Sequence, residues 1–170
     1  MKYIFALIFS FFTSAQAQEL QTVSKLDVKR YMGTWYEVAR LPAWFQDKCK
    51  AETSKADYSL KLNGEIKVVN SCVTHDGKET SAEGVAWQPD ADQPGQLKVS
   101  FMPILKHLHM FGGDYWIIEL ADDYSYVMVG SPDRKYLWIM ARDRNLNHNI
   151  TARLVDKAKA LGYPIERLVD

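Results

Sequence analysis

Few residues of this chain have the types and spacing that catalysis or metal binding requires. Cys49 and Cys72 are its two cysteines, and neither has the spacing of a metal site. A nucleophilic role would need a nearby base or cation to stabilise the thiolate. Lys48 and Lys50 flank Cys49, but sequence neighbours on a loop rarely converge on one sulfur. The two thiols are therefore weak candidates for catalysis.

The histidines give little support for a metal or haem site. His107 and His109 are close enough in sequence to share one face of a strand, but no third ligand stands at a fitting spacing. His75 and His148 fall in an expected turn and beside an expected helix cap. We therefore expect neither a metal nor another cofactor.

Two acidic residues within apolar runs, Glu37 and Glu119, are the remaining candidates for acid–base chemistry. A carboxylate that is buried without a partner has a perturbed pKa and marks a candidate catalytic site. If these two pair instead with Arg40 or Arg142, they are structural, and we favour that interpretation. The sequence therefore predicts a protein that is not an enzyme.

The first residues predict export. Lys2 is a short positive segment, residues 3–12 form an apolar run, and residues 15–17 (Ala-Gln-Ala) have small residues at the alternate positions that a signal peptidase accepts. The run is well short of the ~20 residues that span a bilayer. We expect residues 1–17 to be a signal peptide and residues 18–170 a periplasmic or secreted domain. No cysteine stands near the cleavage point to carry a lipid anchor.

Charge and cysteine usage fit one exported domain. The chain has 21 basic and 21 acidic residues, so it lacks the basic surface that nucleic acid requires. Its length suits a single hydrophobic core. In an oxidising compartment, Cys49 and Cys72 are expected to form a disulfide rather than remain free thiols.

Short runs of alternating apolar and polar residues, separated by turn residues, predict eight β-strands. The dipeptide Asn63-Gly64 is typical of a tight hairpin turn, so the runs on either side should pair antiparallel. The eight runs are 34–41, 52–60, 65–72, 80–88, 95–101, 115–121, 125–131 and 136–142.

After residue 142 the period becomes helical. Asn147 can cap the start of one amphipathic helix and Gly162 can end it. Its apolar side should pack on the outside of the sheet. Eight hairpin-linked strands can form a sandwich or a closed barrel, and a barrel of this size is filled by side chains or holds one small ligand. The pattern alone leaves both architectures open.

Three separated segments resemble the signatures of the lipocalin family. They are Gly33-Thr34-Trp35 followed by YEVAR, GSPDRKYLW at residues 130–138, and Arg142 at the end of LWIMAR. The resemblance covers the mature chain and is strongest to the bacterial outer-membrane lipocalins and their animal relative apolipoprotein D. It implies an all-β, eight-stranded antiparallel up-and-down barrel with the C-terminal α-helix outside. It also implies structural roles for Gly33, Trp35 and Arg142, with the arginine stacked on the tryptophan.

The same resemblance implies non-catalytic binding and transport or storage of a small hydrophobic ligand, a fatty acid or lysophospholipid, in the bacterial cell envelope. Trp138 and Met140 share a face with Arg142 by the two-residue period of a strand, and Tyr115 follows from the resemblance. The expected liners of the ligand pocket are Tyr58, Trp87, Leu97, Val99, Phe101, Tyr115, Ile117, Met128, Trp138 and Met140.

The loop of residues 101–116 is too apolar for an ordinary exposed connection. Three interpretations stay open: an entrance at the barrel mouth, a homodimer contact, or a segment folded back on the barrel. One alternative function is thus a protein-interaction module that uses this loop. The second alternative is a lipid-modifying enzyme of the same fold, which would need a nucleophile or an acid–base pair inside the pocket. Transient contact with a membrane also stays open.

Overall fold

The computed structural model describes residues 19–102, 109 and 111–170. The signal peptide predicted at residues 1–17 and part of the apolar loop, including His107, lie outside the described residues. Within the described ranges, no helix combines the length and the apolar character needed to cross a membrane.

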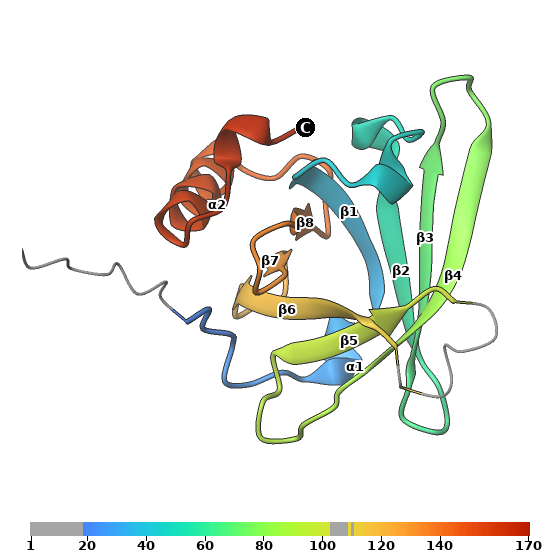
Figure 1. The fold of residues 1–170 in the computed structure, drawn as a ribbon, viewed down its shortest axis with the longest axis vertical. Helices are drawn as coiled ribbons and strands as arrows, with labels where there is room; N and C mark the ends of the chain where they lie inside the picture. Colours follow the sequence, from blue (N-terminus) through green and yellow to red (C-terminus); the bar gives the residue numbers. More distant parts are fainter. Residues whose placement is uncertain (1–18, 103–108, 110) are drawn as a thin grey trace, which may run out of the picture.

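Eight antiparallel strands follow one another around a closed barrel (Figure 1). They are β1 (Gly33–Arg40), β2 (Lys55–Leu60), β3 (Ile66–Val73), β4 (Glu79–Trp87), β5 (Gln96–Ser100), β6 (Gly113–Leu120), β7 (Tyr126–Gly130) and β8 (Leu137–Ala141). Because β1 pairs with both β2 and β8, the ring has no open sheet edge. The predicted up-and-down barrel is confirmed, and the sandwich is excluded.

Six strands begin within one residue of the predicted start, and two begin further from it. The run predicted at 52–60 loses its first residues to a short 3-10 helix, so β2 begins at Lys55. β6 begins earlier than residue 115, because Gly113 already pairs with Val99 of β5. Over the described residues the 3-10 helices are η1 (Trp44–Gln46), η2 (Ala51–Thr53) and η3 (Ile165–Arg167).

A short helix, α1 (Val28–Tyr31), lies across one end of the barrel (Figure 1). Asp27 caps it by accepting hydrogen bonds from the backbone N–H groups of Lys29 at 3.0 Å and Arg30 at 3.2 Å. The alternation of the sequence does not predict this helix. It leads directly into β1, so the start of β1 marks the closed end of the barrel and its last residues mark the open end.

The C-terminal helix, α2 (His148–Ala160), packs against the outside of the barrel, as predicted (Figure 1). Asn147 caps it by accepting a hydrogen bond from the backbone N–H of Asn149 at 2.9 Å. Gly162, with a φ of 84°, follows its end. A glycine adopts this left-handed conformation without steric cost, which explains the termination there.

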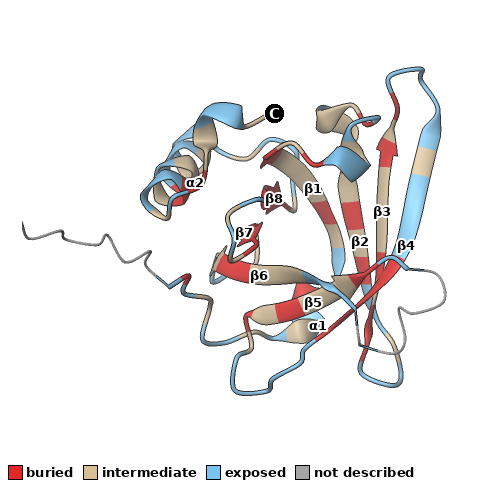
Figure 2. Ribbon diagram, in the orientation of Figure 1, coloured by how far each residue is buried: buried red, intermediate tan, exposed pale blue. Residues whose placement is uncertain are grey.

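Buried apolar side chains form two layers, one inside the barrel and one between the barrel and α2. The inner layer includes Tyr31, Trp35, Ala56, Tyr58, Val68, Leu97, Ile117, Val127, Val129 and Met140. The outer layer includes Leu41, Ile118, Met128, Leu137, Ile139, Leu154 and Ala158. Strands β7 and β8 supply both layers, so they are buried along almost their whole length (Figure 2).

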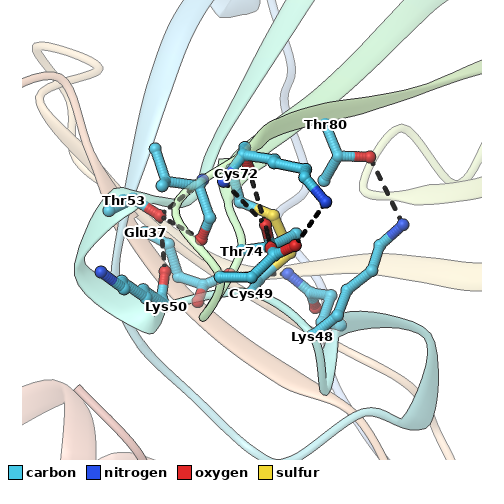
Figure 3. Close-up of a disulfide and its surroundings, with 12 residues drawn as sticks. Glu37, Lys48, Cys49, Lys50, Thr53, Cys72, Thr74 and Thr80 are labelled. Atoms are coloured by element: carbon cyan, nitrogen blue, oxygen red, sulfur yellow. Dashed lines mark hydrogen bonds and ion pairs between the residues drawn. A yellow bond between two sulfur atoms is a disulfide. The ribbon is translucent and has the colours of Figure 1, made fainter.

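The predicted disulfide joins Cys49, in the loop between β1 and β2, to Cys72 of β3, with their Cα atoms 5.7 Å apart (Figure 3). Thr53 supports the same junction, because its hydroxyl donates to the carbonyl of Lys50 at 2.7 Å and accepts from the backbone N–H of Val73 at 2.9 Å. The loop at the open end is therefore fixed to the barrel wall by a covalent bond and hydrogen bonds.

Candidate functional site

The barrel interior is the candidate site, and strand register decides which side chains enter it. Residues paired across neighbouring strands lie on the same face of a sheet. Tyr58 pairs with Val68, Leu97 pairs with Tyr115, and the strand partner of Ile117 is in the inner layer. The expected liners that lie in the inner layer or pack against it are Tyr58, Leu97, Val99, Tyr115, Ile117, Trp138 and Met140. Their contact with a ligand stays a prediction.

Phe101 also faces inward, at the rim. It follows β5 on the same side as Val99, and its ring lies against Gly84, where a Cβ atom would come within 2.8 Å of the Phe101 Cδ1. Gly84 pairs with the inner residue Val68. Phe101 is 37% exposed, so its side chain borders the interior rather than filling it.

The expectation for Trp87 is wrong, because this side chain lies on the outer face. It pairs with Lys98, which forms an outward ion pair with Asp114 at 2.7 Å. His109 stacks on the Trp87 indole, with ring centroids 4.6 Å apart, and its Nε2 lies 2.8 Å from Glu65 Oε1. His109 thus covers the outer side of Trp87. The residues before Trp87 on β4 are buried whichever face they lie on. The alternation of apolar and polar residues therefore could not show which face Trp87 occupies.

The expectation for Met128 is also wrong. Met128 pairs with Ile139 and belongs to the outer layer beneath α2. Val127 and Val129 on either side of it face inward. All three are fully buried, because α2 covers the outside of β7. A strand buried on both faces reads as a continuous apolar run, which hides the direction of each side chain.

The interior stays open to solvent above the closed end. Val99, Tyr115 and Trp138 point inward, yet each is only partly buried, and the inward-facing Ala82 is exposed. In a barrel filled by its own side chains, residues at these positions would be fully buried. Small residues also occupy several inward positions, namely Ala56, Ala82, Gly84, Ala86 and Gly113. The described residues therefore line a calyx, an interior that solvent can reach.

The closed end is sealed by Trp35 and Arg142. The guanidinium carbon lies 3.9 Å from the centroid of the buried indole, a cation–π geometry. Arg142 also donates to the backbone carbonyls of Thr34, Arg30 and Met32, each at 2.8 Å. These bonds satisfy carbonyl groups at the barrel end. The predicted stacking is confirmed, and it is structural because it lies beneath the interior.

Three tyrosine hydroxyls form a polar cluster inside the calyx. Tyr115 is the centre, with its hydroxyl oxygen 2.8 Å from that of Tyr31 and 3.0 Å from that of Tyr58. Burial raises the pKa of Tyr31 and Tyr115 well above the usual value and that of Tyr58 to about 12. The three hydroxyls are therefore protonated and uncharged at physiological pH. We refer to them below as the tyrosine cluster.

A second polar group lies inside the open end. Glu37 and Arg40 face inward from β1, and Glu37 Oε1 lies 2.9 Å from Arg40 Nε. Gln46 of η1 donates its Nε2 hydrogen to Glu37 Oε2 at 3.0 Å and accepts from Trp138 Nε1 at 3.0 Å. Burial raises the pKa of Glu37, although Arg40 and Gln46 act in the opposite direction. The pairing of Glu37 with Arg40 that the sequence suggested is confirmed.

Glu119 is paired too, but with cations that the sequence did not indicate. It faces outward from β6, and Lys157 Nζ of α2 lies 2.7 Å from its Oε2. Arg153 binds its other oxygen. Burial alone would raise the pKa of Glu119, but the hydrogen bonds from these two cations outweigh it and lower the pKa. The carboxylate fixes α2 to the wall and is structural.

A model of a lipocalin-like domain matches residues 26–170. The chain belongs to the lipocalin family. It is 37% identical over 155 residues to temperature-induced lipocalin-1 of Arabidopsis thaliana, covering 90% of this chain and 82% of that protein. The outer membrane lipoprotein Blc of Vibrio cholerae is 32% identical (89% and 85% covered). Mouse apolipoprotein D is 31% identical (96% and 89% covered). The resemblance to both branches is confirmed, and a plant relative shares still more residues.

A solved structure agrees with the lipocalin fold. Insecticyanin of the tobacco hornworm Manduca sexta superposes with a TM-score of 0.67 at 22% identity, covering 91% of this chain and 85% of that one. At this level of identity, the likeness supports the architecture alone.

Two residues of the lipocalin calyx were missed by sequence reasoning. Tyr31 precedes the first strand, in a helix too short to show a period, and Gln46 lies in the 3-10 helix η1. Their roles depend on contacts between distant segments, which no local pattern signals. For a metal, the described residues contain no cluster of three or more histidine, cysteine or acidic side chains that could hold one.

Proposed function

We propose that this lipocalin binds a fatty acid or a lysophospholipid in its calyx and transports or stores it in the envelope of a bacterial cell. The observation that carries the proposal is the open interior, where apolar side chains face inward and remain partly accessible. Members of the family typically bind small hydrophobic ligands. Removing the apolar surface of such a ligand from water supplies about 25 cal/mol per Å², and the bound chain would cover Val99 and Trp138.

The polar group at the open end fits the head of such a lipid. The Arg40 side chain is 6% exposed, and Glu37 is its one side-chain partner among the described residues. Its Nη atoms are therefore free to donate to a carboxylate or phosphate oxygen. An apolar chain below and a guanidinium at the mouth together suit a single-chain amphiphile.

The mouth also suits brief contact with a membrane from which a lipid is taken. Trp44 is 78% exposed and Phe45 is 44% exposed, and they contact each other edge to face with centroids 5.6 Å apart. Phe45 also packs on Tyr136 at 5.7 Å. Aromatic side chains favour the interface between lipid and water, so this rim would enter the headgroup region.

Binding without chemical conversion is the function that the described residues favour. Both cysteines are held in the disulfide, Glu37 and Glu119 are paired, and His109 lies outside the barrel. Export is supported by the predicted signal peptide and by the disulfide, which is stable in an oxidising compartment. The outer membrane lipoprotein among the relatives supports a place in the bacterial envelope.

The test is a titration with a lysophospholipid and with hexadecanoic acid, followed by tryptophan fluorescence. Trp138→Ala should weaken binding several-fold, because the indole lines the calyx and anchors Gln46. Leu62→Ala is the matched control, since Leu62 is fully exposed on the hairpin after β2. Binding of neither lipid to the wild-type protein would overturn the proposal. Equal affinities of both variants would remove Trp138 from the site.

A further inference from the structure

The tyrosine cluster is unusual because its hydroxyls lie among the apolar side chains of the inner layer, toward the closed end of the barrel. Tyr31 comes from α1, Tyr58 from β2 and Tyr115 from β6, so three separate elements converge. The rings of Tyr31 and Tyr58 pack with centroids 5.7 Å apart, and those of Tyr58 and Tyr115 at 6.2 Å. Tyr115 remains partly exposed, whereas the other two are buried. Tyr115 is therefore the member of the cluster that borders the accessible part of the calyx.

The hydrogen bonds of the cluster leave one donor unused. Each tyrosine hydroxyl has one hydrogen to donate, and the three hydroxyls make two bonds with one another. Whichever way these bonds run, one of the three hydrogens has no acceptor among the described residues. A donor that loses water without gaining a partner is costly, so a ligand that displaces water from this part of the calyx avoids the cost only if it brings an oxygen acceptor.

The acceptor that fits this position is uncharged. Arg142 is the cation that acts on the pKa values of Tyr31 and Tyr58, but its guanidinium is bound by backbone carbonyls beneath Trp35. No cationic side chain among the described residues touches the three hydroxyls. Burial disfavours negative charge there, as the raised pKa values of Tyr31 and Tyr58 indicate. A carboxylate at this depth would lack a counter-ion, whereas a hydroxyl or carbonyl oxygen needs none.

We propose that the tyrosine cluster binds a hydroxyl or carbonyl oxygen carried on the hydrocarbon chain of the ligand, so that the calyx prefers oxygenated acyl chains to plain ones. The inference rests on the proposed function, because the headgroup remains at Arg40 and the chain extends toward α1. The cluster then recognises the far part of the chain. A plain chain would leave the unused hydrogen unsatisfied.

The test compares hexadecanoic acid with a series of hydroxyhexadecanoic acids that differ in the position of the hydroxyl. An apolar calyx would bind every hydroxy acid more weakly, because the hydroxyl loses its hydration without compensation. We expect at least one isomer to bind about five-fold tighter than hexadecanoic acid. The two expectations predict opposite changes in affinity on adding the hydroxyl, so the comparison distinguishes them.

The variant that removes the cluster combines Tyr31→Phe, Tyr58→Phe and Tyr115→Phe. It keeps the rings and removes the hydroxyls, so it should bind hexadecanoic acid as before and lose the preference. If the triple variant fails to fold, Tyr115→Phe alone should reduce the preference, because Tyr115 is the accessible member. Tyr36→Phe is the control, since Tyr36 lies on the outer wall beneath Arg144.

The outcomes separate this inference from the proposed function. If the wild-type protein binds neither acid, the proposed function fails and the inference fails with it. If it binds hexadecanoic acid at least as tightly as every hydroxy isomer, the function stands and the inference is overturned. A preference that survives in the triple variant would also overturn it, because the oxygen would then bind elsewhere.

Discussion

The indole N–H of Trp138 donates to Gln46 Oε1 at 3.0 Å, which joins the last strand of the barrel to the loop at its mouth. Gln46 also donates a hydrogen bond to Glu37, and Glu37 forms an ion pair with Arg40. One side chain from a 3-10 helix thus holds together polar groups from two strands. The polar part of the calyx mouth depends on this residue.

Gln46→Leu should destabilise the fold, because it removes both hydrogen bonds at once. Trp138 Nε1 and Glu37 Oε2 would each lose a partner in a partly buried site, at a cost of about 1–3 kcal/mol. Urea unfolding measures the loss. Gln88→Leu is the control, since Gln88 is exposed after β4. An equal effect of both substitutions would show that the connection contributes nothing to stability.

The disulfide should contribute substantially to stability. Cys49 and Cys72 are 23 residues apart in sequence, and closing a loop of this length stabilises a protein by about 2–4 kcal/mol. The double variant Cys49→Ser with Cys72→Ser should lose that amount in urea unfolding. Adding reductant should destabilise the wild-type protein by the same amount and leave the stability of the double variant unchanged. Two reactive thiols in the non-reduced wild-type protein would contradict the bond.

The ion pairs of Glu119 should make stability depend on pH. Its pKa in the folded protein is lowered from the ordinary value of 4.5, so the contribution is present above pH 4.5 and is lost as the pH falls through the lowered value. Glu119→Gln should therefore cost about 1 kcal/mol or less at pH 7, because the cations are partly exposed. The difference from the wild-type protein should vanish in acid.

Urea unfolding at neutral and acidic pH tests this dependence. Glu79→Gln is the matched control, because Glu79 is exposed at the start of β4. A difference between Glu119→Gln and the wild-type protein that persists in strong acid would show that the carboxylate acts through packing rather than charge. Loss of α2 docking would then be the explanation to examine, because Lys157 and Arg153 both belong to that helix.

The sequence predicts the barrel well because its evidence is local. Alternation and turn dipeptides indicate each strand, and the residues Gly33, Trp35 and Arg142 carry the signatures that indicate closure. The face of each side chain is predictable only where one face is wet. On β5, Leu97 and Lys98 differ in polarity, so the inward residue is evident and the structure agrees.

The same reasoning fails where the outer face is also covered. Trp87 is covered by His109, and Met128 is buried by α2. The tyrosine cluster could not be predicted either, because its members lie far apart in sequence and meet only when the barrel closes. Long-range contacts, rather than local propensity, decide these positions.

Met128 and Met140 provide the sharpest test of the assigned faces, because they lie on neighbouring strands and point in opposite directions. Both are buried, so replacing either with alanine should cost about 2–5 kcal/mol of stability. Only Met140→Ala should also weaken lipid binding, since only Met140 faces the calyx. Met128→Ala should leave the affinity of the folded protein within about two-fold of the wild type. If Met128→Ala weakens binding as much as Met140→Ala, the outer layer beneath α2 contributes to the ligand site, and the assignment from strand register is wrong.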